Sequence, residues 1–138
     1  TGTPVNGVYK LVEIDGIPVM KESSSKATFA GRKQVFRQYE GDRAVQDHLG
    51  LATESQNHGA QPLLQPVMQN GKLIAQLDAL SDIAQRTAQS VASLSPEVRQ
   101  VQAPQPYPVH ITSNLDQQTQ AARDRRAARA PGASWRLW

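Results

Sequence analysis

Residues Gly7–Tyr39 read GVYKLVEIDGIPVMKESSSKATFAGRKQVFRQY, and this stretch decides the fold that the sequence predicts. Val8–Ile14 alternates in the manner of a strand. Neither of its sides is cleanly polar, so we expect this strand to be covered on much of both faces. Asp15-Gly16 follows, and this dipeptide favours a hairpin because a type I′ turn needs positive φ at both central positions. Ile17–Met20 is then the return strand.

Further strand patterns lie beyond this hairpin. Lys33–Tyr39 alternates again, and Val45–Leu51 fits either a further strand or a helical turn. A second hairpin signal, Asn70-Gly71, separates the segments Leu63–Met68 and Lys72–Ile74. The N-terminal half of the chain is therefore predicted to be built from short antiparallel strands.

From Leu77 onward the spacing of apolar residues changes to that of an amphipathic helix. The residues on this stripe are Leu77, Leu80, Ala84, Ala88, Val91 and Leu94. The proline-rich segment Ala103–Val109 must be extended, and it leads to a strand at Val109–Ile111. A second helix is expected from Asn114 to about Arg129, and its thin apolar face predicts weak docking. The predicted fold class is α+β, with a small antiparallel sheet of hairpins followed by two or three helices.

The composition limits the kind of protein. The chain has 138 residues, of which 38% are hydrophobic and 5% aromatic, which suits one domain with a lean aliphatic core. It contains no cysteine, which is compatible with the cytoplasm, and no apolar run long enough to span a bilayer. It begins at Thr1 without a methionine or a leader pattern, so we expect a piece of a longer protein.

The positive charge is concentrated at the end of the chain. The whole chain carries a formal net charge of +3, whereas five arginines and one aspartate give residues 121–138 a net charge of +4. The body is therefore close to neutral, and this weakens a nucleic-acid interpretation based on the basic pI. Residues 123–138 are predicted to form an Arg-rich, flexible tail outside a segment that covers residues 1–122.

The best candidate for chemistry is the polar stretch from Lys21 to Lys33. It combines hydroxyl groups at Ser23–Ser25 with cationic side chains, which suits the oxygens of a phosphate or diphosphate. The cationic residues are Lys21, Lys26, Arg32 and Lys33. An exposed polar loop, with lysines present for solubility, explains the same pattern, and composition alone does not separate the two.

Other candidates are weaker. His48, His58 and His110 lie far apart, without the spacing of metal ligands. Asp15, Asp42 and Asp47 are expected in turns or loops. The sequence lacks a nucleophile elbow, a Walker A motif and a dinucleotide-binding fingerprint. We therefore expect no complete catalytic constellation and no metal site within this chain.

The stretch Gly7–Arg37 resembles a region of nicotinate phosphoribosyltransferases that follows a phosphate-binding glycine loop. The family pattern is GVYKLV, a glycine turn, a Lys-Ser-Lys-Thr run, PGRK and an aromatic-Arg pair, and Ala30 stands here where proline is usual. The resemblance extends over residues 1 to about 122. Its motifs in this chain are Gly7-Val8-Tyr9-Lys10-Leu11, Gly16, Lys21, Ser25-Lys26, Gly31-Arg32-Lys33, Arg37, Pro62-Leu63-Leu64, Asn70-Gly71-Lys72-Leu73, Leu94-Ser95-Pro96-Glu97 and Tyr107-Pro108-Val109.

This resemblance implies the C-terminal segment of an enzyme that makes nicotinate mononucleotide and diphosphate from nicotinate and phosphoribosyl pyrophosphate. It further implies coupled ATP hydrolysis, a requirement for Mg²⁺, a cytoplasmic homodimer, and an irregular α/β barrel with an α/β domain. The catalytic residues are expected upstream of Thr1, so this segment should be inactive by itself. By the same resemblance, the candidates for contact with phosphate or a subunit interface are Lys21, Ser25, Lys26, Arg32 and Lys33.

Two interpretations of another class remain open. A non-catalytic accessory module would pack on a partner through the stripe from Leu77 to Leu94. A nucleic-acid binder would use residues 123–138 and bind with a steep salt dependence. The near-neutral body makes the nucleic-acid interpretation the weaker of the two.

Overall fold

The structure is a computed structural model that describes residues 2, 7–21, 28–55 and 59–129. The chain divides into two compact units. The terminal unit comprises Thr1–Arg32 and Ser113–Trp138, and the central unit comprises Lys33–Thr112.

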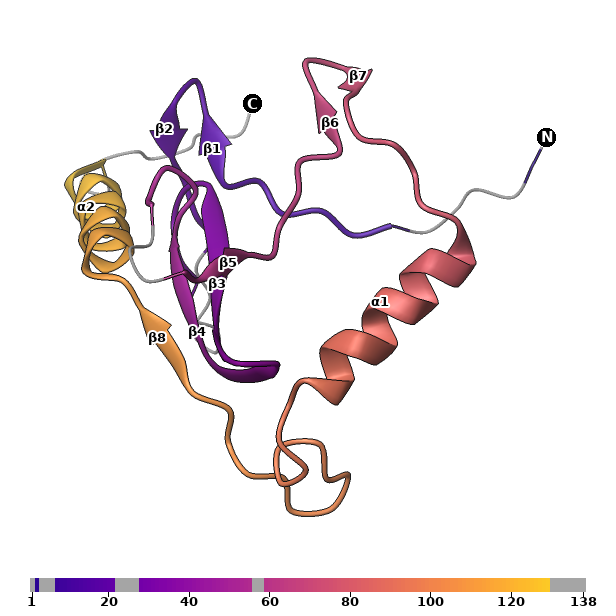
Figure 1. Cartoon of the computed structure of the whole chain (residues 1–138). Coiled ribbons are helices and arrows are strands. Elements are labelled where there is room, and N and C mark those ends of the chain that lie inside the picture. Colours follow the sequence, from indigo (N-terminus) through magenta and orange to yellow (C-terminus); the bar gives the residue numbers. More distant parts are fainter. Residues whose placement is uncertain (1, 3–6, 22–27, 56–58, 130–138) are drawn as a thin grey trace. The chain divides into compact units, whose positions relative to one another are not determined.

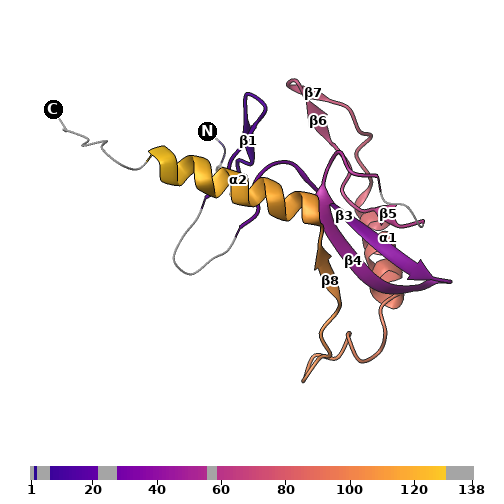
Figure 2. The ribbon, with the colours of Figure 1, turned by 90° about the vertical axis from the view of Figure 1, so that its left-hand side faces the viewer.

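A four-stranded sheet forms the body of the central unit (Figure 1). Its order is β5 (Gln61–Pro62), β3 (Lys33–Glu40), β4 (Arg43–Leu51) and β8 (Val109–Ile111). The strand predicted at residues 33–39 is confirmed, and residues 45–51 form a strand rather than a helical turn. β4 lies between β3 and β8 in both ribbon views (Figure 2).

The two long strands of this sheet are joined by a hairpin that contains a bulge. Next to the turn Tyr39 faces Ala44, but the following pair is Gln38 with Gln46. Val45 is therefore the extra residue of the bulge, and it shifts the register of β3 and β4 by one position. Beyond the bulge Arg37 faces Asp47, a pair that symmetric counting from the turn would miss.

The strand β8 differs from the other partners in its direction. It runs parallel to β4, with His110 beside His48, whereas β3 pairs with β4 and β5 in antiparallel fashion. A parallel partner requires a long crossover, and residues 52–108 supply it. The sheet therefore contains one parallel edge that a series of hairpins would not produce.

The crossover carries a small hairpin and a helix. β6 (Met68–Gln69) and β7 (Lys72–Leu73) meet at the predicted turn, where Asn70 and Gly71 have φ of 51° and 73°. α1 spans Leu80–Ala92 and begins three residues after the start of the predicted stripe. The Asp82 carboxylate accepts a hydrogen bond from the Ala79 backbone N–H at 3.3 Å, which caps the first turn.

The terminal unit combines a short hairpin with a helix. β1 (Glu13–Ile14) pairs with β2 (Ile17–Pro18), and Asp15 and Gly16 have the positive φ values, 48° and 74°, that the sequence predicts. The predicted coverage of residues 8–14 on both faces is wrong. Val8 and Tyr9 are fully open to solvent, because only Glu13 and Ile14 have a partner strand among the described residues.

The helix of the terminal unit, α2, spans Ser113–Arg129 and continues through residue 122. Leu115 and Thr119 are completely buried, so the first half of α2 docks more firmly than its thin apolar face predicts. The division of the chain at residue 122 remains a prediction, and residues 130–138 lie outside the described residues.

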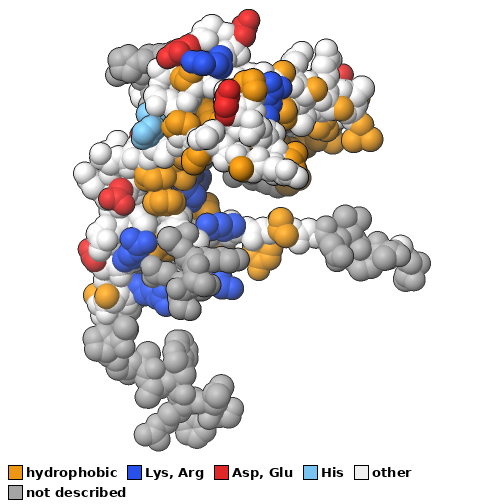
Figure 3. Space-filling model, turned by 90° about the horizontal axis from the view of Figure 1, so that it is seen from below, with side chains coloured by type: hydrophobic (Ala, Val, Ile, Leu, Met, Phe, Trp, Pro, Cys, Tyr) orange, Lys and Arg blue, Asp and Glu red, His pale blue; other side chains and the backbone are white. Residues whose placement is uncertain are grey.

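The core of each unit is small, as the low aromatic content indicates. Among the described residues, the buried hydrophobic side chains are Ala30 and Leu115 in the terminal unit and Phe36 and Ala44 in the central unit. Many larger hydrophobic side chains are exposed instead, and Figure 3 shows several of them open on the surface. The α+β fold class with two helices among the described residues agrees with the prediction.

Candidate functional site

The structure describes both ends of the polar stretch that is predicted to bind phosphate. Lys21 is exposed, and its carbonyl oxygen accepts a hydrogen bond of 2.8 Å from the Thr28 hydroxyl. Ser25 and Lys26, two of the five predicted residues, lie outside the described residues. The other three, Lys21, Arg32 and Lys33, are described.

The segment that follows the loop is fixed to α2. The Ala30 backbone N–H donates to the Thr119 hydroxyl at 3.2 Å, and the Gln118 amide donates to the Ala30 carbonyl oxygen at 3.1 Å. Proline has no N–H and could not make the first of these bonds. The family that this sequence resembles usually has proline here. Alanine at this position thus gains a buried hydrogen bond to Thr119 of α2.

Gly31 turns the chain at the end of this segment. Its φ of 82° lies in the left-handed region, and its N–H donates to the Val12 carbonyl oxygen at 3.0 Å. A Cβ atom here would overlap the Gln118 amide nitrogen and lie 3.3 Å from Pro18. The backbone conformation therefore favours glycine, and a side chain here would also have to displace the end of the Gln118 side chain.

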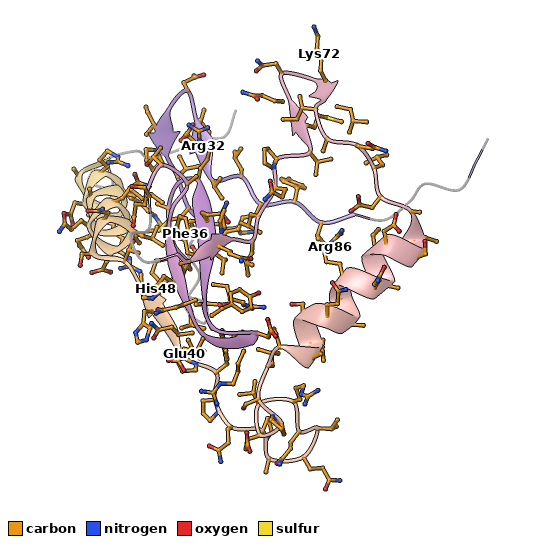
Figure 4. The ribbon with its side chains drawn as sticks, in the orientation of Figure 1. Arg32, Phe36, Glu40, His48, Lys72 and Arg86 are labelled. Atoms are coloured by element: carbon orange, nitrogen blue, oxygen red, sulfur yellow. The ribbon has the colours of Figure 1, made fainter. Side chains whose placement is uncertain are left out.

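Arg32 and Lys33 follow this turn in different surroundings. Arg32 pairs with Glu13 of β1 at 3.2 Å, yet its side chain is 68% exposed (Figure 4). Lys33 is half-buried and begins β3, where it faces Leu51. The structure thus places Lys21 and Arg32 in the terminal unit and Lys33 in the central unit.

The chemistry of these side chains is electrostatic. An ammonium and a guanidinium group bind phosphate oxygens through charge-assisted hydrogen bonds. The exposure of Lys21 and Arg32 leaves them accessible to an anionic ligand or to a partner surface.

A buried polar cluster in the central unit was missed by the sequence analysis, which expected Asp47 in a turn or loop. Asp47 lies in β4 and binds Arg37 of β3 through two hydrogen bonds of 2.9 Å each. The Tyr107 hydroxyl donates to the same carboxylate at 3.0 Å, and Arg37 donates to the Ser90 hydroxyl of α1 at 3.2 Å. The cluster therefore joins the sheet to α1 and to the proline-rich segment.

The protonation of this cluster is set by its burial and its contacts. The hydrogen bond to Asp47 raises the pKa of Arg37 above its already high usual value. Burial, together with the hydrogen bond to Asp47, raises the pKa of Tyr107 to about 12. Because both carboxylate oxygens of Asp47 already accept hydrogen bonds, the cluster suits a structural role better than acid–base catalysis.

Two of the histidines meet across the sheet. The rings of His48 and His110 stack with centroids 5.3 Å apart, because β4 and β8 place these residues side by side. Sequence spacing could not reveal this, since the pairing depends on the parallel crossover. Within the described residues, no group of three or more histidine, cysteine or acidic side chains is arranged to hold a metal ion. His58 lies outside the described residues.

No helix among the described residues is both long and apolar enough to cross a membrane.

Comparison with known proteins places this chain in an enzyme family. Residues 53–119 match the family described as nicotinate phosphoribosyltransferase C-terminal domain. The nicotinate phosphoribosyltransferase pncB2 of Mycobacterium tuberculosis is 38% identical over 112 residues, which cover 78% of this chain and 23% of that protein. The human nicotinate phosphoribosyltransferase is 31% identical over 135 residues, which cover 80% of this chain and 25% of that protein.

The structural comparison agrees. The crystal structure of human nicotinic acid phosphoribosyltransferase matches with a TM-score of 0.68 and 28% identity, over 83% of this chain and 26% of that chain. The chain spans about a quarter of the length of the relatives that it matches. It belongs to the nicotinate phosphoribosyltransferase family and carries the C-terminal domain of that family.

Proposed function

We propose that this chain acts as the C-terminal part of a nicotinate phosphoribosyltransferase, which joins nicotinate to phosphoribosyl pyrophosphate and releases nicotinate mononucleotide and diphosphate. The observation that carries the proposal is the match of both sequence and structure to about a quarter of relatives that bear this name, together with the match to their C-terminal domain family. The proposal includes coupled ATP hydrolysis, a homodimer and the cytoplasm, which the family resemblance implies.

The proposed contribution of this chain is electrostatic. Lys21, Ser25, Lys26, Arg32 and Lys33 form the candidate set for the phosphates of the substrates or for a subunit interface. Pre-placed cations at a phosphate site stabilise charge without transferring protons. The family resemblance implies that the catalytic residues lie in the preceding part of the enzyme, so the chain is proposed to be inactive without that part.

The proposed reaction also involves Mg²⁺, and the described residues do not fit a site for it. Mg²⁺ prefers six oxygen ligands, usually a few carboxylates together with phosphates and water. The described part of the chain offers no cluster of three acidic or histidine side chains. We therefore assign no residue of this chain to the metal ion.

The test uses three proteins. The first is intact pncB2 of Mycobacterium tuberculosis, the second is pncB2 without the region that this chain matches, and the third is pncB2 with that region replaced by this chain (the hybrid). Formation of nicotinate mononucleotide from nicotinate, phosphoribosyl pyrophosphate and ATP is measured for each. We expect activity from intact pncB2 and the hybrid, and none from the truncated protein or from this chain alone.

The second candidate function is a non-catalytic, partner-binding module. The observation that favours it is α1, which exposes its hydrophobic side chains. A truncated pncB2 with full activity would support this candidate and would contradict an essential role of the domain in the enzyme.

A further inference from the structure

α1 presents an uncovered stripe of apolar side chains. Leu80 is 84% exposed, Ile83 41% and Val91 47%, and no residue of this helix is buried. These positions recur at the three- and four-residue spacing that places side chains on one face of a helix. A stripe of this kind normally packs against another element of the protein.

The contacts that hold α1 in the central unit leave this stripe free. Arg37 donates to the Ser90 hydroxyl, and the Ala44 backbone N–H donates to the Ser93 carbonyl oxygen at 2.9 Å. Both contacts are at the C-terminal end of α1 and use a hydroxyl and a backbone carbonyl oxygen, not the apolar side chains. Ser90 borders the stripe, about 20° around the helix from Ile83.

A helix such as α1 depends on tertiary packing. It has 13 residues, a length at which an isolated helix is marginal in water. Its first turns are held by local contacts, the Asp82 cap and an ion pair between Arg86 and Asp78 at 2.6 Å. Surface ion pairs contribute little to stability, so the apolar stripe is where a packing partner would add most.

We propose that the stripe Leu80–Ile83–Val91 is the docking surface for the part of the nicotinate phosphoribosyltransferase polypeptide that precedes this region. The inference rests on the proposed function. In the relatives this region is about a quarter of one longer polypeptide. The other three quarters of the same polypeptide are therefore always present as a packing partner.

The size of the stripe favours this partner over a second copy of the chain. A helix of 13 residues is about 20 Å long, and pairing two such stripes would bury far less than the roughly 1,200 Å² of a stable interface. Docking within one polypeptide does not need so large an area, because the linkage keeps the effective concentration near millimolar. A small apolar stripe is therefore sufficient for intramolecular packing and insufficient for dimerisation.

The test compares two double variants, each in the hybrid and in the isolated chain. Leu80→Glu with Ile83→Glu places two charges on the stripe, and Gln85→Glu with Gln89→Glu places the same two charges on the opposite, exposed side of α1. All four substitutions introduce a good helix former, so intrinsic helix propensity is kept or improved. The readouts are the rate of trypsin cleavage, circular dichroism, sedimentation and formation of nicotinate mononucleotide.

In the hybrid, we expect Leu80→Glu with Ile83→Glu to raise the trypsin cleavage rate at least ten-fold, whereas the control variant cleaves as the unmodified hybrid does. In the isolated chain, we expect neither variant to change circular dichroism or sedimentation. Equal cleavage of both hybrid variants would overturn the inference. Destabilisation of the isolated chain by Leu80→Glu with Ile83→Glu would also overturn it, because the chain itself would then cover the stripe. The same holds if the isolated chain self-associates and these two charges abolish the self-association.

The two proposals fail in different ways. An unmodified hybrid that resists trypsin but makes no nicotinate mononucleotide would contradict the proposed function and leave the docking surface supported. An unmodified hybrid that is cleaved as fast as the isolated chain would contradict the docking surface.

Discussion

Arg37 and Asp47 face each other across β3 and β4 and share two hydrogen bonds of 2.9 Å, with side chains only 14% and 10% exposed. This bidentate geometry is the strong form of a hydrogen-bonded pair between a guanidinium group and a carboxylate. It fixes the register beyond the bulge and, through Ser90 and Tyr107, connects the sheet to α1 and to the proline-rich segment, both in the second half of the long crossover. The central unit is therefore organised around a polar pair as much as around its small apolar core.

Replacement of Asp47 by alanine should lower the free energy of unfolding by about 3 kcal/mol, because it leaves a largely buried guanidinium without its partner. Urea denaturation of the isolated chain measures this. The control is Glu40→Gln, which breaks the exposed pair between Arg43 and Glu40 and should cost less than about 1 kcal/mol. Equal effects of the two substitutions would show that the buried pair does not organise the unit.

Replacement of Tyr107 by phenylalanine should cost about 1 kcal/mol, the value of one hydrogen bond to Asp47. It should also change the response to alkaline pH. The pKa of Tyr107 is raised to about 12 in the folded protein, whereas a free tyrosine has a pKa of about 10. The folded state therefore holds this proton more tightly than the unfolded state does.

The corresponding contribution to stability is complete below pH 10 and is lost as the pH rises from about 10 through about 12. Urea denaturation between pH 9 and 12 should show a steeper loss of stability in the wild-type chain than in Tyr107→Phe. Parallel curves for the two proteins would contradict the raised pKa.

Replacement of Gly31 by alanine should destabilise the terminal unit more than replacement of Gly16. Both glycines have positive φ, which costs about 1 kcal/mol for a residue with a side chain. At Gly16 the space is open, whereas at Gly31 the new Cβ displaces the Gln118 amide from Ala30. Thermal unfolding of Gly31→Ala, Gly16→Ala and Gly31→Ala with Gln118→Ala separates the two effects, and the last variant should recover part of the loss.

Replacement of Lys26 by alanine in the hybrid should raise the KM for phosphoribosyl pyrophosphate several-fold and leave the unfolding temperature unchanged, because one charge is removed from the proposed phosphate-binding set. Lys26 lies outside the described residues, so this prediction rests on sequence. Lys72→Ala is the control, since Lys72 lies at the tip of the β6–β7 hairpin (Figure 4). Unchanged kinetics for Lys26→Ala would refute its role.

Local signals in the sequence predicted the turns and both helices. Asp15-Gly16 and Asn70-Gly71 carry their own conformational requirement, and α1 has a regular apolar period. The bulge at Val45 has no comparable signal, because it depends on how β3 and β4 fit together. Without the bulge, counting from the turn pairs Arg37 with Gln46, and the buried pair with Asp47 is missed.

The parallel direction of β8 and the exposure of the α1 stripe could not be predicted from the sequence for a similar reason. Both depend on contacts between residues far apart in the chain, as with His48 and His110. An apolar period predicts that a helix face packs but does not say against what. Of the five candidate site residues, the structure describes three and places them, while their role in phosphate binding stays a prediction.

The measurement that tests the account most directly is the rate of nicotinate mononucleotide formation by the hybrid beside truncated pncB2 and this chain alone. We expect the hybrid to recover activity that the truncated protein lacks, and this chain alone to have none. Activity of this chain by itself, or a hybrid as inactive as the truncated protein while stably folded, would contradict it.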